Sequence, residues 1–347
     1  MSALFLLKIR EDYSEDPSYS GSYQIATGMW NSAKFVVDTL NARGYPAMIA
    51  LAIDGNSIDR LVMRYNPSIV FIEGLWVVPE KIAELQSLAR HADREWVVRV
   101  HSEIPFLASE GIAFDWIMEY LKMGTTVAPN SPRVVDQIKK LAIACNVNNS
   151  IPYLPNCYPT VFQPYSQSDL DLRTIDTINV GLFGAYRVLK NHVQQALNAI
   201  QYAKLINKKL RLHVNSRVDA SGQGPYRNVA GMFKHLPADE FELVEHGWES
   251  RELFLQSLAE IDVLLQDSIS ETFNIVAADA VLVGRPVLGS SEIPWLYPLT
   301  STPTDHIASM QALEAIMSNK VFFIEQNRAS LIKYANQSAN LWLKFLL

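Results

Sequence analysis

The chain has 347 residues, of which 49% are hydrophobic and 19% charged, so it can bury a core and is neither a disordered nor a low-complexity chain. At roughly 100–200 residues per domain, this length predicts two domains. The formal net charge is −6, a sign that disfavours a protein dedicated to nucleic acid, and residues 1–165 and 166–347 each have more acidic than basic side chains.

The two cysteines, Cys145 and Cys157, are too few for a disulfide framework and favour a reducing, cytoplasmic location. No run of consecutive apolar residues is long enough to cross a membrane. The apolar run near the N-terminus has no basic segment before it, and Lys8 and Arg10 follow at once. We therefore predict a buried first strand there and no signal peptide.

In residues 1–165, short apolar runs alternate with helix-length segments. The pattern predicts strands at 3–9, 47–53, 69–73, 96–100, 125–128 and 151–154, and helices at 30–43, closed by Gly44, and at 80–91. Strands separated by helix-length segments imply parallel pairing through crossover helices. We therefore expect an α/β domain with a doubly wound sheet over 1–165.

The polar segment 163–176 interrupts this rhythm and is the predicted linker. The alternation then restarts, with strands at 178–183, 210–215, 241–245, 263–266, 286–289 and 321–324, and helices at 191–206, 251–260 and 276–283. A second α/β domain is thus predicted over 175–325. Residues 328–347 form a predicted amphipathic helix, with Leu331, Tyr334, Leu341 and Phe345 on its apolar face.

Open parallel sheets bind ligands outside the carboxyl ends of their strands, so the functional residues should follow strands and face the cleft between the domains. The strongest such segment is 263–290. A buried strand leads to a polar loop with Ser268, Ser270 and Glu271, and a helix with Asp279 follows. We expect Glu271 at the helix N-terminus, with Asp279 a little over two turns later, so that both acids face one cleft.

A second segment, 180–192, takes Gly184 from a strand into a loop with Arg187 and Lys190, just before a helix. Cations near a helix N-terminus are unfavourable unless they face an anion. A diphosphate would be such an anion, and two cations would stabilise the charge that it gains as a leaving group. A solvated basic loop is the alternative reading.

These two segments resemble the family-four glycosyltransferases of the GT-B fold. That family has Glu, seven residues, Glu, a helix of small residues and Gly-x-Pro-Val, and earlier in the chain Gly-Arg followed by Lys-Gly or Lys-Asn. Here the second acid is Asp279, and Arg187 stands three residues after Gly184. The resemblance implies that Glu271 contacts donor-sugar hydroxyls, that Asp279 contacts ribose hydroxyls and that Arg187 and Lys190 hold the diphosphate. The neighbours expected to complete this donor site are Ser270, Thr272, Phe273 and Asn274.

Other motifs fit the same family less specifically. His101 follows the strand at 96–100, where the family often has a His near the donor sugar, with Glu103 as its neighbour; a structural His is the alternative. Trp248 stands in the segment expected to line the base pocket, where core packing is equally possible. Gly21 is placed in a phosphate or acceptor loop. The segment 151–164, with Asn156 and Cys157, is read as the structural end of the first domain.

The resemblance implies two Rossmann-like domains facing across a cleft, with residues 326–347 returning as a helix to the first domain. It implies transfer of a sugar from a UDP- or GDP-linked donor to a saccharide or other hydroxyl acceptor, with retention of configuration. It also implies no cofactor and no metal; Asp169 and Asp171 lie in the linker and are not read as a metal site. The alternatives are a non-catalytic sugar- or nucleotide-binding protein, and an enzyme acting on a polymer such as modified DNA, for which neither half has a basic charge.

Overall fold

The computed structural model describes residues 1–9, 27–166, 170, 176–216, 222–300 and 302–347. The chain divides into two compact units. The first comprises Met1–Pro159 with Ala335–Leu347, and the second comprises Thr160–Tyr334. The first stretch thus ends at Pro159, before the boundary expected at 165. The C-terminal segment that belongs to the first unit begins at Ala335, after the boundary expected at 326.

The first unit is built on five parallel strands in the order β2-β1-β3-β4-β5. Its elements are β1 (Ala3–Lys8), α1 (Thr27–Ala42), β2 (Ala47–Ala52), α2 (Ser57–Tyr65), β3 (Ile69–Glu73), α3 (Pro79–Ser87), the 3-10 helix η3 (Ala89–His91), β4 (Glu95–Val100), α4 (Ile104–Leu107), α5 (Ala113–Lys122), β5 (Thr126–Pro129) and α6 (Pro132–Ala144). All strands pair in parallel, as the alternation predicts.

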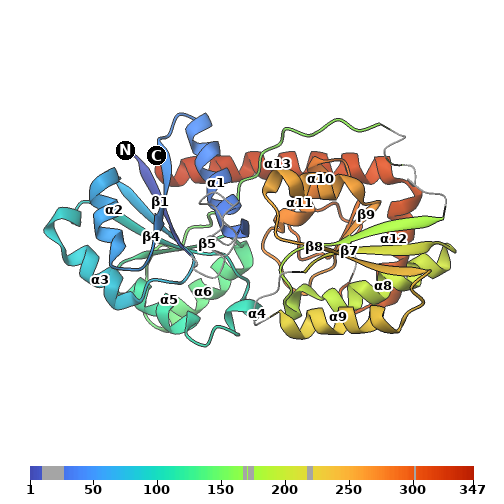
Figure 1. Ribbon diagram of the computed structural model, residues 1–347. Helices are drawn as coiled ribbons and strands as arrows, with labels where there is room; N and C mark the ends of the chain where they lie inside the picture. The colour runs from blue at the N-terminus through green and yellow to red at the C-terminus, as the bar shows by residue number, and fades with distance from the viewer. Residues whose placement is uncertain (10–26, 167–169, 171–175, 217–221, 301) are drawn as a thin grey trace. The chain divides into compact units, whose positions relative to one another are not determined.

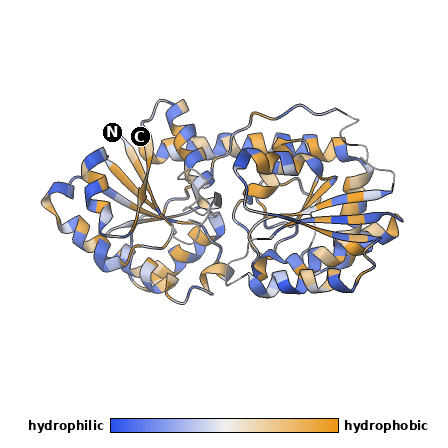
Figure 2. Cartoon of the chain, in the orientation of Figure 1, coloured by the Kyte–Doolittle hydropathy of each residue, from blue (hydrophilic) through white to orange (hydrophobic). Residues whose placement is uncertain are grey.

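Helices cover both faces of this sheet. α1 lies on one face, and α2, α3 and α5 lie on the other (Figure 1). The strands are the most apolar part of the unit (Figure 2), and Leu4, Val70 and Val98 of neighbouring strands have no exposed surface. As predicted, Gly44 follows the end of α1; its φ of +82° suits a glycine after a helix.

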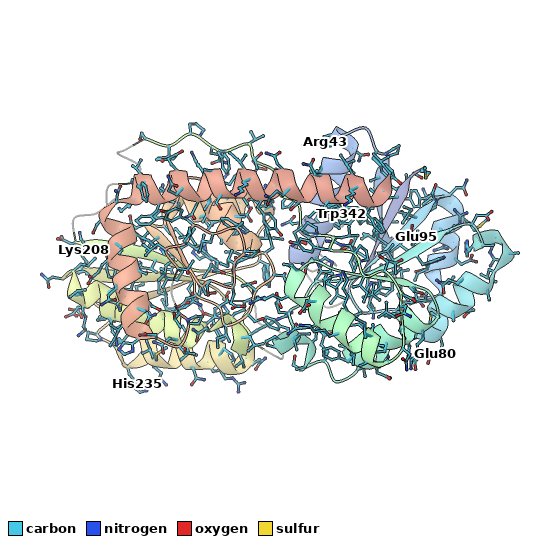
Figure 3. The ribbon with its side chains drawn as sticks, turned by 180° about the vertical axis from the view of Figure 1, so that it is seen from behind. Arg43, Glu80, Glu95, Lys208, His235 and Trp342 are labelled. Atoms are coloured by element: carbon cyan, nitrogen blue, oxygen red, sulfur yellow. The ribbon has the colours of Figure 1, made fainter. Side chains whose placement is uncertain are left out.

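The end of the chain belongs to this unit. The final helix, α13 (Lys320–Leu346), contributes its residues from Ala335 onward. Trp342 points from α13 into the sheet (Figure 3), packs at a tilt against the rings of Phe5 and Phe71, and donates from Nε1 to the carbonyl of Pro155 at 2.8 Å. The buried face of this segment therefore centres on Trp342, and Leu341, an expected core residue, is 36% exposed.

The second unit repeats the architecture with the order β10-β9-β6-β7-β8, again all parallel. Its elements are β6 (Thr177–Leu182), the 3-10 helix η4 (Val188–Lys190), α8 (His192–Leu205), β7 (Lys209–Asn215), α9 (Gln223–His235), β8 (Phe241–His246), α10 (Arg251–Glu260), β9 (Val263–Gln266), α11 (Ile275–Leu282), β10 (Val287–Gly289) and α12 (His306–Ser318). α8 and α9 lie on one face of the sheet, and α10 and α11 on the other (Figure 1).

Two predicted strands are wrong. Residues 151–154 form no strand, because Pro152 and Pro155 lack the N–H groups that a ladder needs. A backbone hydrogen bond from Leu154 N to Pro129 O still ties the segment to the end of β5. Residues 321–324 are the first turn of α13, in which Ile324 is buried. An apolar run this short has no period that separates strand from helix. No helix in the described part of the chain has the length and apolar content needed to cross a lipid bilayer.

Candidate functional site

The candidate site lies in the second unit, where the strand order reverses. β6 and β9 are neighbours at the centre of the sheet, and the chain leaves them in opposite directions along it. Loops that diverge from two adjacent carboxyl ends leave room for a ligand, which is why open α/β sheets bind ligands at this point. The two strongest sequence motifs, in segments 180–192 and 263–290, contain the loops that follow these two strands.

The loop after β6 is anchored through its backbone. Gly184 has a φ of +111°, and its N–H donates to Asn215 Oδ1 at 2.8 Å, at the end of β7. Beyond Arg187 the chain makes a 3-10 turn to Lys190, and Asn191 then enters α8 in the left-handed conformation. Asn191 Nδ2 donates to the carbonyl of Asp267 at 3.1 Å, which ties this loop to the one after β9. Asn215 is therefore part of the site and was missed by the sequence analysis.

In the loop after β9, three donors converge on the buried carboxylate of Glu271. Its Oε1 accepts from Lys190 Nζ, from Ser268 Oγ at 3.0 Å and from Asn274 Nδ2 at 2.8 Å. Asn274 also donates to Gln266 Oε1 at 2.9 Å. The structure thus brings together Lys190 and Glu271, which the sequence analysis assigned to different parts of the donor.

The expected place of Glu271 at a helix N-terminus is wrong. α11 begins at Ile275, and its N-cap is Asn274, whose Oδ1 accepts from the N–H of Ala277 at 2.9 Å. Asn274 adopts a φ of +63°, which Asn tolerates better than most residues. Glu271 stands in the loop before the cap, so a spacing argument within one helix does not relate it to Asp279.

The buried polar atoms of these loops that have no hydrogen-bond partner among the described residues include Nε of Arg187 and Oγ of Ser270. Buried polar atoms in folded proteins are nearly always paired, with protein, water or ligand. Arg187 is half-buried and Ser270 buried. Both belong to the predicted donor-binding set, and an anionic ligand with hydroxyl groups could supply the missing partners.

Asp279 contacts a different cation. Its Oδ1 lies 2.7 Å from Arg251 Nη2, at the first residue of α10, and the Asp279 carboxylate is almost fully buried. Sequence reasoning missed Arg251. The signal that could have revealed it is its position: a cation at the N-terminus of a helix is unfavourable unless an anion lies nearby.

The remaining predicted residues of the second unit divide into two groups. Trp248, between β8 and α10, and Thr272 are half-buried and reach the surface of the unit. Phe273 is a core residue: its ring packs near Trp295 and Tyr334, and its carbonyl accepts from Trp295 Nε1 at 2.6 Å. Its side chain is therefore used for packing.

In the first unit, His101 lies one residue after β4, and its Nε2 is 2.6 Å from Glu73 Oε2 at the end of β3. Arg99 Nη1 lies 3.0 Å from both oxygens of Glu73. Burial alone would raise the pKa of Glu73, but the charge of Arg99, together with the hydrogen bonds from His101 and Arg99, holds it below the usual value. Burial and the Arg99 charge lower the pKa of His101, so the imidazole is neutral near pH 7.

Glu103, the expected neighbour of His101, instead accepts hydrogen bonds from Ser131 and from Arg133. Asn156 is buried and accepts from Ser32 Oγ at 3.0 Å, which fits its structural reading. Cys157 is buried as well, and burial raises the pKa of its thiol to about 12. Gly21, Asp169 and Asp171 lie outside the described residues. Among the residues that are described, no three His, Cys, Asp or Glu side chains are grouped so that they could hold a metal ion.

No protein-family model matches the sequence, and no curated protein matches it. Solved structures do. The chain is similar to sucrose-phosphate synthase from Thermosynechococcus elongatus (TM-score 0.69, 14% identity, 100% of this chain and 99% of that chain covered). It is similar to the N-terminal domain of Candida albicans trehalose-6-phosphate phosphatase (0.70, 8%, 100% and 97%) and to Anabaena HepE in complex with UDP and glucose (0.63, 13%, 100% and 98%).

At these identities the likeness establishes the fold. Two Rossmann-like α/β domains with a C-terminal helix make up the GT-B fold, and this part of the prediction is confirmed. Membership of family four stays a prediction. The roles of the site residues likewise stay predictions.

Proposed function

We propose that the protein transfers a sugar from a nucleoside-diphosphate sugar to a hydroxyl acceptor, with retention of configuration and without a metal. The observation that carries the proposal is the cluster in the two loops at the reversal point of the second sheet. There Lys190 contacts Glu271, and the same loops contain buried polar atoms of Arg187 and Ser270 that have no hydrogen-bond partner among the described residues. The Anabaena protein of this fold was solved with UDP and glucose, which supports a nucleotide sugar as the ligand. We also propose a cytoplasmic location.

Arg187 and Lys190 would stabilise the departing diphosphate. Negative charge builds on the leaving group in the transition state, and preorganised cations stabilise that charge without reorganising. Both residues belong to the loop that Gly184, Asn191 and Ile269 anchor through hydrogen bonds. In a front-side reaction the leaving phosphate can itself take the acceptor proton, so we nominate no protein general base.

Glu271 would bind the donor sugar. A carboxylate accepts hydrogen bonds from sugar hydroxyls, and Ser268 and Asn274 fix its orientation. In the structure Lys190 lies on the same carboxylate. We propose that the diphosphate draws Lys190 away from Glu271 on binding, so that the charge of the ligand replaces the charge of the carboxylate.

The first experiment is a thermal-shift screen with UDP, GDP, ADP and TDP, each alone and as sugar conjugates, with and without EDTA. A ligand that binds only the folded protein raises its melting temperature by mass action. We expect one diphosphate series to raise it, with the same shift in EDTA. A shift that needs a divalent cation would contradict metal independence, and no shift with any ligand would contradict nucleotide binding.

The second experiment measures transfer with the best donor in Arg187→Ala, Lys190→Ala and Lys234→Ala. Lys234 is an exposed cation on α9 and serves as the control. Loss of one group that stabilises the leaving charge should lower kcat about 100-fold or more. Wild-type turnover in both the Arg187 and Lys190 variants would overturn the assignment of these residues.

A non-catalytic nucleotide- or sugar-binding protein is the second candidate. The observation that favours it is that both predicted ligand-binding carboxylates already contact cations: Glu271 contacts Lys190, and Asp279 contacts Arg251. This candidate predicts a thermal shift with a nucleotide but neither sugar transfer nor donor hydrolysis by the pure protein. An enzyme that acts on DNA would, in addition, be retained on a DNA column in a salt-dependent way.

A further inference from the structure

We propose that Gln195 is a positioning residue of the candidate donor site. Its side-chain amide joins the backbone of Lys190 to the loop that follows β9, so that the Lys190 side chain can leave Glu271 for a diphosphate while its backbone stays in place. The inference rests on the proposed function for the identity of the ligand, whereas the link between the two loops does not depend on it.

Gln195 lies in the first turn of α8, shortly after Lys190, and its side chain is buried. Its Nε2 donates to the carbonyl of Lys190 at 2.7 Å, and its Oε1 accepts from the N–H of Asp267 at 2.8 Å. Only this orientation of the amide pairs a donor with an acceptor at both ends, since the opposite one would place the NH2 group against the N–H of Asp267. One side chain therefore spans the two loops that form the site.

Further hydrogen bonds join the same two loops. The N–H of Ile269 donates to the carbonyl of Leu189 at 2.8 Å. Asn191 Nδ2 donates to the carbonyls of Asp267, at 3.1 Å, and Pro303, at 2.9 Å. Asn191 is the N-cap of α8, yet its side chain makes no capping hydrogen bond, although capping is the usual role of an Asn at this position. Its amide serves the contact between the loops instead.

The loop after β9 is also held by α12. Asp267 Oδ2 accepts from Ser309 Oγ at 2.9 Å, and both residues are buried. Release of Gln195 from either loop would leave a buried donor or acceptor without a partner, which carries the full desolvation cost of that group. We therefore expect the two loops to stay joined when a ligand binds.

The side chain of Lys190, in contrast to its backbone, can move. It is 27% exposed, and its contact with Glu271 is made by the ammonium group at the end of a flexible stem. Rotation of this stem can carry the charge to a bound diphosphate without any change in the backbone that Gln195 holds. A cation positioned in this way stabilises the leaving group with little reorganisation, which lowers the barrier to transfer.

Kinetics test whether Gln195 acts through Lys190. The probes are the UDP-, GDP-, ADP- and TDP-sugars of the thermal-shift screen, and turnover is measured with the one that gives the highest rate. Gln195→Met keeps the length of the side chain but can form neither hydrogen bond. It should lower kcat about tenfold or more with little change in donor KM, because a misplaced cation acts on the transition state. In the Lys190→Ala background the same substitution should cause no further loss.

Gln194→Met is the matched control. Gln194 precedes Gln195 on α8, and its amide donates to Asn198 Oδ1 on the same helix at 3.0 Å. The substitution should leave kcat unchanged. A Gln195 that only stabilised the fold would lower kcat by the same factor with and without Lys190. Such an equal loss, or wild-type kcat in Gln195→Met, would overturn the positioning role.

Hydrogen exchange followed by NMR tests the link without any variant. In the wild type the N–H groups of Asp267 and Ile269 should exchange slowly, and they should stay protected in saturating UDP, GDP, ADP or TDP. Fast exchange in the free protein would overturn the link, and loss of protection on nucleotide binding would overturn the fixed backbone. A wild type inactive with every donor would contradict the proposed function instead, and the exchange rates would still decide whether the loops are joined.

Discussion

Buried carboxylates recur in this protein, and each of three lies beside a cation: Glu73 beside Arg99, Asp279 beside Arg251 and Glu271 beside Lys190. An ionised group taken out of water needs an opposite charge or strong hydrogen bonds, because desolvation costs several kcal/mol. Two of the pairs have one member that is partly exposed, namely Lys190 and Arg251. Those two cations reach the solvent, whereas the side chain of Arg99 has no exposed surface.

The Arg251–Asp279 pair gives a prediction on stability. Arg251→Met should destabilise the protein by about 3 kcal/mol, because it leaves the buried Asp279 carboxylate without its cation. The double variant Arg251→Met with Asp279→Asn should recover most of this loss, since it removes both charges. Urea unfolding of the wild type, both single variants and the double variant measures the coupling between the two residues. A double variant whose loss is the sum of the two single losses would show that the pair carries no coupling.

Two buried histidines predict a loss of stability in mild acid. Burial, followed by the charge of Lys190, is the main cause that lowers the pKa of His192 to about 3. For His213, burial and then the charge of His246 lower the pKa to about 4. In the unfolded chain both rings take up a proton near pH 6.5. Between pH 6.5 and about 4 the unfolded state therefore binds more protons, so stability falls as pH drops, by about 1.4 kcal/mol per pH unit for each histidine.

Urea midpoints between pH 7.5 and 5 check this dependence. His192→Gln removes one titrating group and should reduce the slope by about one proton, although its absolute stability also changes because the ring stacks on Tyr186. Exposed His235 on α9 supplies the control, and His235→Gln should keep the wild-type slope. A slope equal to the wild type in His192→Gln would contradict the prediction.

At the scale of elements, the turn from α11 into β10 depends on a glycine. Gly284 follows the end of α11 with a φ of +74°, and the N–H of Arg285 returns to the carbonyl of Ala280 at 2.8 Å. A Cβ at Gly284 would lie 2.6 Å from Cδ1 of Tyr165. Tyr165 is held by Glu325, whose carboxylate accepts from its hydroxyl at 2.7 Å, so the ring is not free to move away.

We predict that Gly284→Ala destabilises the protein by at least about 2 kcal/mol, because it combines a left-handed backbone with overpacking. Gly231→Ala is the matched control: Gly231 lies inside α9 with no atom near its hypothetical Cβ, so alanine should stabilise by about 0.5–1 kcal/mol. Denaturant unfolding measures both. Tyr165→Ala in the Gly284→Ala background should recover the part due to the clash. Equal stability of the two glycine variants would contradict this account of the turn.

At the scale of the whole molecule, one helix contributes to both units. α13 supplies residues up to Tyr334 to the second unit and residues from Ala335 to the first. In the second unit Arg328 donates to the carbonyl of Gln163, and in the first unit Trp342 packs against β1 and β3. The core of the first unit is therefore incomplete without the segment Ala335–Leu347.

We predict that Trp342→Ala destabilises the first unit by about 3–5 kcal/mol, because it removes a fully buried indole and leaves the carbonyl of Pro155 without its donor. Leu341→Ala, at the neighbouring exposed position, should change little. Hydrogen exchange should locate the loss in residues 1–159, with protection in β6 to β9 retained. Equal loss of protection in both sheets would contradict an effect confined to one unit.

The local pattern of apolar residues was enough to predict the architecture. Buried parallel strands are continuous apolar runs, so 69–73, 178–183 and 263–266 could be recognised as strands without knowing their partners. The same alternation predicted two α/β domains. It failed at 321–324, where a short apolar run begins α13, because burial alone does not distinguish a strand from the first turn of a helix.

Single residues of the site could be predicted from their local position, but the contacts between them could not. Lys190 and Glu271 were found because each stands in a loop that follows a strand. Their contact, and the contacts of Arg251 with Asp279 and of Arg99 with Glu73, join residues far apart in the sequence. Such pairs depend on strand order and register, and these are set by the packing of the whole sheet. Charge in an apolar run, as at Arg99, indicates that a partner exists, but only the folded chain determines which residue it is.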